Sequence, residues 1–223
     1  MSEFALDHIN EVITAVAIKS GRNSADIKLI GVTKTMESEA IVRLVAEGVT
    51  SLGENRVQDF LPKYEALRPN EPEWHFIGHL QRNKVKFIID KVAMIHSLDS
   101  LALANEINKR AEQVRKVMDV LIEVNIGDEE SKHGVCPTKA LGLAREILPL
   151  KNIRLQGLMC IAPFVENPED NRQYFKNMRK LLVDINNCSP HNLRELSMGM
   201  SGDYAIAIEE GATMVRIGTA LVR

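Results

Sequence analysis

The chain has 223 residues, a formal net charge of −2 and a hydrophobic share of 45%, which is the composition of a soluble globular protein. The small net charge argues against nucleic acid as the main partner, because nucleic-acid-binding proteins carry a basic excess that neutralises phosphates. Residues 1–13 lack the pattern of a secretory signal, and no run of about 18 apolar residues is present to span a membrane.

Short apolar runs alternate with amphipathic helical segments along the whole chain. A segment of helical period comes first, at about residues 3–19. Eight apolar runs then predict strands at residues 27–34, 50–55, 73–78, 94–99, 119–125, 154–161, 194–200 and 213–219. The segments between them carry apolar residues at i, i+3 and i+4, as in a helix that packs on a sheet. This alternation predicts parallel strands joined by right-handed helical crossovers.

Eight strands favour a closed (β/α)8 barrel of the TIM type over an open sheet. Because the chain ends at Arg223, soon after the eighth strand, we expect no outer helix after that strand. We predict that the N-terminal helix covers the gap. Without a linker or a break in composition, residues 1–223 are expected to form a single domain. The cysteines Cys136, Cys160 and Cys188 lack CxxC spacing, which favours free thiols and a cytoplasmic location.

Lys34 closes the first predicted strand, where a (β/α) barrel carries its reactive groups. Apolar walls around the barrel mouth would favour the neutral amine, which is a nucleophile for an aldehyde. Position alone favours the simpler alternative of a solvent-exposed lysine at the end of a strand. Lys34 is therefore a candidate only in combination with other signals.

The last two strands carry the second signal. Ser201 and Gly202 form a small-residue turn before a short predicted helix that begins near Asp203. We predict that Ser201 caps this helix and faces an anion. Gly218 and Thr219 end the eighth strand, and barrels often build phosphate sites from these two loops. Ordinary strand-to-helix turns use the same small residues, so this alternative stays open.

Several motifs together resemble a known family. In chain order they are GVTKT, SLGENRVQDF, WHFIGHLQRNK, VNIGDEESKHGV, GLMCIAP, ELSMGMSGDY and MVRIGTAL. They resemble the pyridoxal phosphate homeostasis family, also called the YggS or PROSC type, from about residue 25 to the end. The resemblance implies a fold similar to the barrel domain of alanine racemase and bacterial ornithine decarboxylases, without their second, β-rich domain.

The resemblance also implies a cofactor and its contacts. Lys34 would hold pyridoxal 5'-phosphate (PLP) as a Schiff base, and Arg216 would approach the pyridine nitrogen. A guanidinium there disfavours protonation of that nitrogen, which makes the ring a poorer electron sink. The remaining cofactor contacts would come from Asn55, Met200, Ser201, Gly218 and Thr219.

Three functions are compatible with these sequence features. The first is a non-catalytic, monomeric carrier that holds PLP and delivers it to acceptor enzymes. The second is a minimal PLP-dependent amino-acid racemase, which needs a base on each face of the substrate; Tyr204 is the one tyrosine near Lys34's proposed site. The third is a sugar- or nucleotide-phosphate enzyme, which would share the phosphate loops but leave Lys34 without a role.

Other polar residues have simpler explanations. His75 and His79 have a spacing that can bind zinc on a helix, but they flank a strand end, and we expect His75 to be a hydrogen-bonded barrel residue. The loop Asp128–Gly134 is interpreted as an exposed turn away from any strand end, or alternatively as a flap over the mouth. Cys160 is expected to be a buried small hydrophobe.

Overall fold

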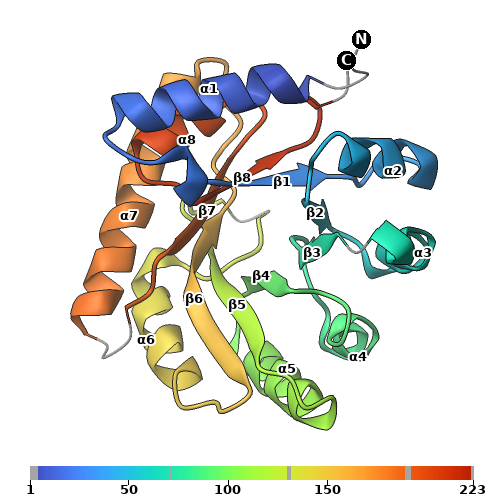
Figure 1. Cartoon of the computed structure of the whole chain (residues 1–223). Coiled ribbons are helices and arrows are strands. Elements are labelled where there is room, and N and C mark those ends of the chain that lie inside the picture. Colours follow the sequence, from blue (N-terminus) through green and yellow to red (C-terminus); the bar gives the residue numbers. More distant parts are fainter. Residues whose placement is uncertain (1–4, 71, 130–131, 189–191, 222–223) are drawn as a thin grey trace.

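The computed structural model describes residues 5–70, 72–129, 132–188 and 192–221. Eight parallel strands form a closed barrel in the order of the sequence, and the ring closes where the last strand pairs with the first (Figure 1). The strands are β1 (Lys28–Val32), β2 (Ser51–Glu54), β3 (Glu73–Phe76), β4 (Met94–Leu98), β5 (Met118–Val124), β6 (Ile153–Cys160), β7 (Glu195–Met200) and β8 (Met214–Ile217).

One α-helix lies between each pair of consecutive strands, so the predicted (β/α)8 barrel is confirmed. These helices are α2 (Ser38–Ala46), α3 (Val57–Leu67), α4 (Val85–Ile88), α5 (Leu101–Gln113), α6 (Pro137–Ile147), α7 (Arg172–Asn187) and α8 (Tyr204–Glu209). Single turns of 3-10 helix add η1 (Ser24–Asp26), η2 (Arg68–Asn70), η3 (Arg82–Lys84) and η4 (Pro168–Asn171).

All eight predicted strands exist, but most are shorter than the apolar runs that predicted them. The run at 27–34 contains a strand only over Lys28–Val32. Its last residues turn instead, because the Met36 N–H donates to the Thr33 carbonyl at 2.9 Å. Lys34 consequently lies in a loop just beyond the strand rather than on it.

Helix α1 (Leu6–Lys19) fills the place in the ring that follows β8, as predicted. It buries Leu6, Ile9, Ile13 and Ala17 and lies beside α8 (Figure 1). The Ala5 N–H donates to the Leu221 carbonyl at 3.1 Å, which joins the start of the helix to the segment after β8. The predicted helix began at residue 3, and residues 1–4 lie outside the described residues.

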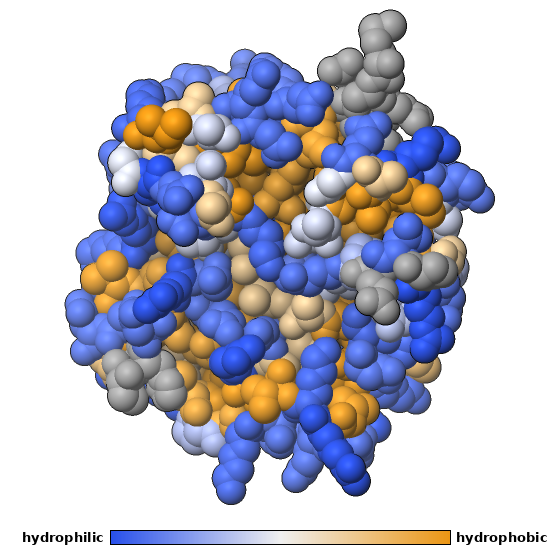
Figure 2. Space-filling model, in the orientation of Figure 1, coloured by the Kyte–Doolittle hydropathy of each residue, from blue (hydrophilic) through white to orange (hydrophobic). Residues whose placement is uncertain are grey.

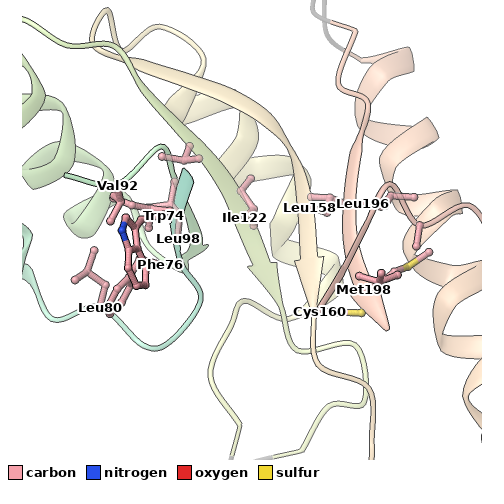
Figure 3. Packing of buried hydrophobic residues seen from close by; sticks show 14 of the residues in the cluster. Trp74, Phe76, Leu80, Val92, Leu98, Ile122, Leu158, Cys160, Leu196 and Met198 are labelled. Atoms are coloured by element: carbon pink, nitrogen blue, oxygen red, sulfur yellow. The ribbon is translucent and has the colours of Figure 1, made fainter. Parts of the chain in front are cut away.

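The main apolar core lies between the strands and the surrounding helices. Strands β3 to β7 supply most of the side chains labelled in Figure 3, which are Trp74, Phe76, Leu80, Val92, Leu98, Ile122, Leu158, Cys160, Leu196 and Met198. A second, smaller apolar cluster consists of Ile30, Met94, Leu121, Met159 and Met214. Because alternate residues of a strand face opposite sides, every strand contributes to both the outer core and the barrel interior.

The face of the molecule seen in Figure 2 is mainly hydrophilic. In Figure 2 hydrophilic residues cover most of the visible face, and hydrophobic residues show between the outer helices and near the centre. Within the described part of the chain, no helix has the length and apolarity that crossing a bilayer requires.

Candidate functional site

Lys34 lies at the carboxyl end of β1, beside a pocket of about 650 Å³. Val32, Gly218 and Thr219 line the same pocket, because β1 pairs with β8 in the barrel. Lys34 is exposed, so the expectation that apolar walls enclose its amine was wrong. The structure thus brings three of the predicted site residues together and leaves the amine accessible.

A buried polar network fixes the residue before Lys34. The Thr33 hydroxyl donates to Glu54 Oε1 at 2.6 Å, and Lys63 Nζ donates both to that oxygen and to the Thr33 carbonyl at 2.7 Å. Glu54 ends β2 and is fully buried, while Lys63 comes from α3. The network therefore ties the carboxyl ends of two strands to an outer helix, directly behind the loop that carries Lys34.

Ser201 joins the loop after β7 to the loop after β8. Its hydroxyl oxygen accepts from the backbone N–H groups of Gly218 at 3.2 Å and Ala220 at 3.3 Å. The predicted helix-capping role of Ser201 was wrong, because α8 begins at Tyr204 with Asp203 at its N-cap. The Asp203 carboxylate instead accepts from the Met200 N–H at 2.7 Å. The Gly218 and Ala220 amides therefore converge on one oxygen atom, which is also how backbone N–H groups bind an anion.

Arg216 occupies the interior of the barrel and is only 4% exposed. Its Nη1 donates to the Ser197 hydroxyl at 2.6 Å, and its Nη2 donates to the Cys160 carbonyl at 2.7 Å. Burial lowers the pKa of Arg216 from its ordinary value, but an arginine keeps its charge in proteins. The site therefore holds a fixed cation on β8, two residues before Gly218.

The two remaining predicted contacts lie at the ends of two other strands, β7 and β2. Met200 pairs with Arg216 across β7 and β8 and is 38% exposed. It lines a separate pocket with residues 161–165 of the loop after β6. Asn55 follows β2 and is half-buried. Both therefore lie at the carboxyl edge of the barrel, where the prediction placed them.

Glu123 is a buried carboxyl group that sequence reasoning missed. It lies on β5, is 6% exposed, and its Oε2 has no hydrogen-bond partner among the described residues. Burial, reinforced by the charge of Asp99, raises the pKa of Glu123 to about 7. The charge of Arg216 acts in the opposite direction and lowers the pKa of Glu123.

Sequence reasoning also missed a polar chain through the barrel. His75 is hydrogen-bonded to Glu73 and His96, both at 2.8 Å, so the prediction of a satisfied barrel residue is confirmed. His96 in turn reaches the Ser197 hydroxyl at 2.9 Å. A signal was present in the sequence, because these polar residues occupy alternate positions within apolar strands and so share the inward face.

The loop after β5 differs from its prediction. It begins at the very end of that strand, and Val124 and Val135 form a bridge at its base. Glu129 accepts from Lys132 Nζ at 2.5 Å, and the same amine donates to the Ala162 carbonyl at 3.2 Å. The interpretation of its carboxylates as distant from a strand end was therefore wrong. Residues 130–131 lie outside the described residues.

The histidine of this loop contacts another loop of the barrel mouth. His133 stacks on His79 with ring centroids 4.0 Å apart, and His79 Nδ1 lies 3.5 Å from the Asp99 carboxylate. The loop after β5 thus lies over the carboxyl edge of the barrel. Cys160 is fully buried, as predicted, and burial raises the pKa of its thiol to about 12.

Comparison with known proteins connects this site to a family. Residues 6–223 match the family described as alanine racemase, N-terminal domain. A protein from Aquifex aeolicus named pyridoxal phosphate homeostasis protein is 50% identical over 216 residues, which are 97% of this chain and 95% of that protein. A protein of the same name from Synechocystis is 38% identical over 87% of this chain and 90% of its own length.

Solved structures agree with these relatives. PipY from Synechococcus elongatus with PLP bound is 29% identical, with a TM-score of 0.84 over 95% of this chain and all of that one. An alanine racemase from Clostridium difficile is 20% identical, with a TM-score of 0.67. This second match covers 96% of the chain but 55% of the racemase, and it shows the shared barrel fold alone.

Proposed function

Because the chain belongs to the pyridoxal phosphate homeostasis proteins within the alanine racemase N-terminal domain family, we propose that it binds PLP, holds it as a Schiff base on Lys34 and delivers it to acceptor enzymes. One observation carries this proposal. Lys34, Gly218 and Thr219 line a single pocket, and the Ser201 hydroxyl meets the Gly218 amide at the same strand end.

The side chains around the mouth fit PLP. Its phosphate needs several donors, and the amides of Gly218 and Ala220, which converge on the Ser201 oxygen in this structure, would donate to a phosphate oxygen in its place. Its aldehyde needs an accessible amine, which Lys34 provides. Its ring nitrogen needs a donor when unprotonated, and Arg216 has five N–H groups, of which two donate to Ser197 and Cys160. Thr219, Asn55 and Met200 are the further contacts that we assign.

Lys34 supplies the covalent step of the proposal. The Lys34 amine would form a carbon–nitrogen double bond with the aldehyde carbon of PLP, and the aldehyde oxygen would leave as water. The reverse reaction needs only water or a competing amine. A lysine in an accessible loop, rather than deep in an apolar pocket, suits such reversible holding because a competing amine can approach it.

The arrangement supports a carrier better than a racemase. PLP supplies an electron sink for carbanion chemistry when its ring nitrogen is protonated, and the cationic Arg216 opposes that protonation. A racemase also needs a second base, for which Tyr204 is the candidate. Burial raises the pKa of Tyr204 above its ordinary value of 10, so its hydroxyl is neutral at physiological pH and is a poor base.

Borohydride trapping tests the covalent part of the proposal. The purified protein is saturated with PLP, its visible absorbance is recorded, and the imine is reduced and located by peptide mapping. We expect the label on Lys34 and its loss in the Lys34→Ala variant. Lys109→Ala is the matched control, because Lys109 is an exposed lysine on α5 outside the site.

Two outcomes would contradict the proposal. A protein that gains no absorbance with PLP would leave the sugar- or nucleotide-phosphate enzyme as the better explanation. Rapid exchange of the α-proton of an added amino acid, lost in Lys34→Ala, would favour the racemase over the carrier.

Delivery to acceptor enzymes needs its own test. An apo PLP enzyme is mixed with the loaded protein in the presence of a phosphatase that destroys free PLP. We expect the acceptor to regain activity faster than with an equal amount of free PLP, and equal rates would exclude protected delivery. Size-exclusion chromatography with light scattering tests the accompanying proposal that the chain is monomeric. A cytoplasmic location also belongs to the proposal, and cell fractionation tests it.

A further inference from the structure

A continuous chain of hydrogen bonds crosses the barrel interior from Arg216 to the amino ends of the strands. Arg216 Nη1 lies 2.6 Å from Ser197 Oγ, and Ser197 Oγ lies 2.9 Å from His96 Nδ1. The far ends of the two imidazoles complete it: His96 Nε2 lies 2.8 Å from His75 Nδ1, and His75 Nε2 lies 2.8 Å from Glu73 Oε1. We call Ser197, His96, His75 and Glu73 the interior relay.

The relay ends at a solvent-accessible pocket on the opposite side of the barrel from Lys34. Glu73 begins β3 and lines this pocket with Lys28 and Asp26. The same carboxylate oxygen that contacts His75 also accepts from Lys28 Nζ at 2.6 Å. The hydrogen bond from His75, aided by Lys28, lowers the pKa of Glu73 to about 2. Glu73 is therefore an ionised acceptor at neutral pH.

The charge of Glu73 sets the direction of every bond in the relay. Burial lowers the pKa of both His75 and His96, so each imidazole is neutral and has one donor and one acceptor nitrogen. A carboxylate can only accept, so His75 Nε2 must carry the proton and His75 Nδ1 must accept. His96 Nε2 must then donate and His96 Nδ1 must accept from the Ser197 hydroxyl. That leaves the Ser197 oxygen free to accept from Arg216.

The shared direction of these hydrogen bonds matters because Arg216 is a buried cation. Its two hydrogen bonds to described residues go to neutral oxygens, those of Ser197 and Cys160. A buried charge is costly unless it is paired or its hydrogen bonds are well made. The charges of Glu123 and Asp203 act on Arg216 directly. The relay adds a hydrogen-bonded connection to the ionised Glu73 through bonds that all point the same way, and aligned hydrogen bonds strengthen one another.

We propose that Ser197, His96 and His75 are positioning residues, which tie Arg216 to Glu73 and thereby hold its guanidinium in the orientation from which it donates to the ring nitrogen of bound PLP. The inference rests on the proposed function for its ligand. No proton is transferred along the relay: the proposal concerns the direction of its bonds and the orientation of Arg216.

Nitrogen NMR of the protein without PLP tests the direction of the bonds. We expect both His75 and His96 to be neutral and protonated on Nε2 at pH 7, with each resonance assigned from its His→Gln variant. An imidazolium, or a proton on Nδ1 of either ring, would overturn the relay. This measurement is independent of whether the protein binds PLP.

Titration of PLP into the Glu73→Gln variant tests the positioning role, because Glu73 lies at the end of the relay opposite Arg216. Glu73→Gln keeps an acceptor at the end of the relay but removes the charge that orients it. The lost charge acts on Arg216 only through the intervening hydrogen bonds, so we expect a moderate weakening of roughly three- to tenfold in the Kd of PLP, with a shifted absorbance maximum. Asp26→Asn is the matched control, since it removes a charge from the same pocket outside the relay.

The outcomes separate the inference from the proposed function. Wild-type protein that fails to bind PLP contradicts the proposed function, while the NMR result still decides the relay. Wild-type binding with an unchanged Kd and spectrum in Glu73→Gln contradicts the positioning role alone. If Glu73→Gln does not fold, Ser197→Ala replaces it, with an expected loss of about tenfold or more because it breaks the bond to Arg216 directly. A relay that only stabilised the barrel would lower the unfolding midpoint and leave the bound spectrum unchanged.

Discussion

Glu123 shows how the barrel interior treats a single carboxyl group. The side chain is almost fully buried, and its Oε2 has no hydrogen-bond partner among the described residues. Desolvation is the largest cause of its raised pKa, and the Asp99 charge adds to it. At neutral pH the group therefore exists in both protonation states, and the charge of Arg216 favours the ionised one.

The Glu123→Gln variant is expected to remove a pH-dependent loss of stability. A carboxyl group with a pKa near 4.5 in the unfolded chain and about 7 in the folded one keeps its proton longer when folded. Its contribution is therefore complete below about pH 4.5 and is lost as the pH rises through 7, with an upper limit of about 3 kcal/mol. Glutamine has the same shape and does not titrate. Urea denaturation at pH 5 and pH 8 measures the free energy of unfolding of both proteins. Relative to wild type, the variant should be more stable at pH 8 than at pH 5.

Other groups titrate over the same range but do so in both proteins. His75 and His96 have lowered pKa values, so their contributions are present above about pH 6.5 and are lost as the pH falls below it. These contributions are the same in both proteins, so they cancel when the stability of the variant is compared with that of wild type. An equal difference at both pH values would show that Glu123 is already ionised in the folded chain.

Individual site residues differed in how far the sequence predicted them. Arg216 and Gly218 came from the family motif and from strand alternation, and both lie at the predicted strand end. The role of Ser201 depends on a contact with Gly218, which lies seventeen residues further along the chain in another loop. A local sequence pattern does not show that these two loops meet. The relay was missed because His96 and Ser197 each lie inside an apolar run. Their hydrogen bond joins β4 to β7, and only the closed barrel brings these strands' inward faces together.

At the scale of elements, the network of Thr33, Glu54 and Lys63 joins α3 to β1 and β2. Lys63→Met is expected to cost about 3–5 kcal/mol, because it leaves the Glu54 carboxylate buried without its partner. It should also slow the trapping of PLP on Lys34, since Thr33 loses its bond to Lys63 Nζ. Urea denaturation and borohydride labelling measure the two effects.

A double variant provides the control for this network. Glu54→Gln with Lys63→Met removes both charges and should recover part of the lost stability. Lys109→Met, an exposed lysine on α5, should change neither measurement. If the single and double variants were equally destabilised, packing of the Lys63 stem rather than the ion pair would explain the loss.

The contact between the carboxyl ends of β2 and β3 yields a second prediction at this scale. A Cβ atom added at Gly78 would lie 2.1 Å from the Asn55 carbonyl oxygen, so one of the two backbones would have to move. Gly78→Ala is expected to cost about 1–3 kcal/mol and to weaken PLP binding through Asn55. Gly142→Ala in α6 is the matched control: an added Cβ meets nothing within 4 Å, and alanine should stabilise the helix by up to about 1 kcal/mol. Equal effects of the two changes on the unfolding midpoint would exclude the steric explanation.

For the whole molecule, the repeated alternation of strand and helix was enough to predict the barrel. Seven apolar runs are each followed by an amphipathic helix, and the eighth run, covered by the N-terminal helix, closes the ring. Strand ends were predicted less well, because residues such as Thr33 and Lys34 continue an apolar run in sequence but turn in space. The loop at residues 128–134 was misplaced relative to β5 for the same reason, since hydropathy does not specify where a strand stops pairing.

Closure of the ring by α1 suggests that residues 1–223 unfold as one cooperative unit. Ile9 is 2% exposed on the inner face of α1, whereas Ile18 is 69% exposed. Ile9→Ala should therefore cost about 2–5 kcal/mol, and Ile18→Ala should cost little. The only tryptophan, Trp74, lies on β3, which β1 and β2 separate from β8 in the barrel. In a single domain, Trp74 fluorescence and far-UV circular dichroism must report the same lowered urea midpoint for Ile9→Ala. A fluorescence midpoint that stays at the wild-type value while circular dichroism shifts would mean that α1 unfolds separately, and the closed ring would then not depend on it.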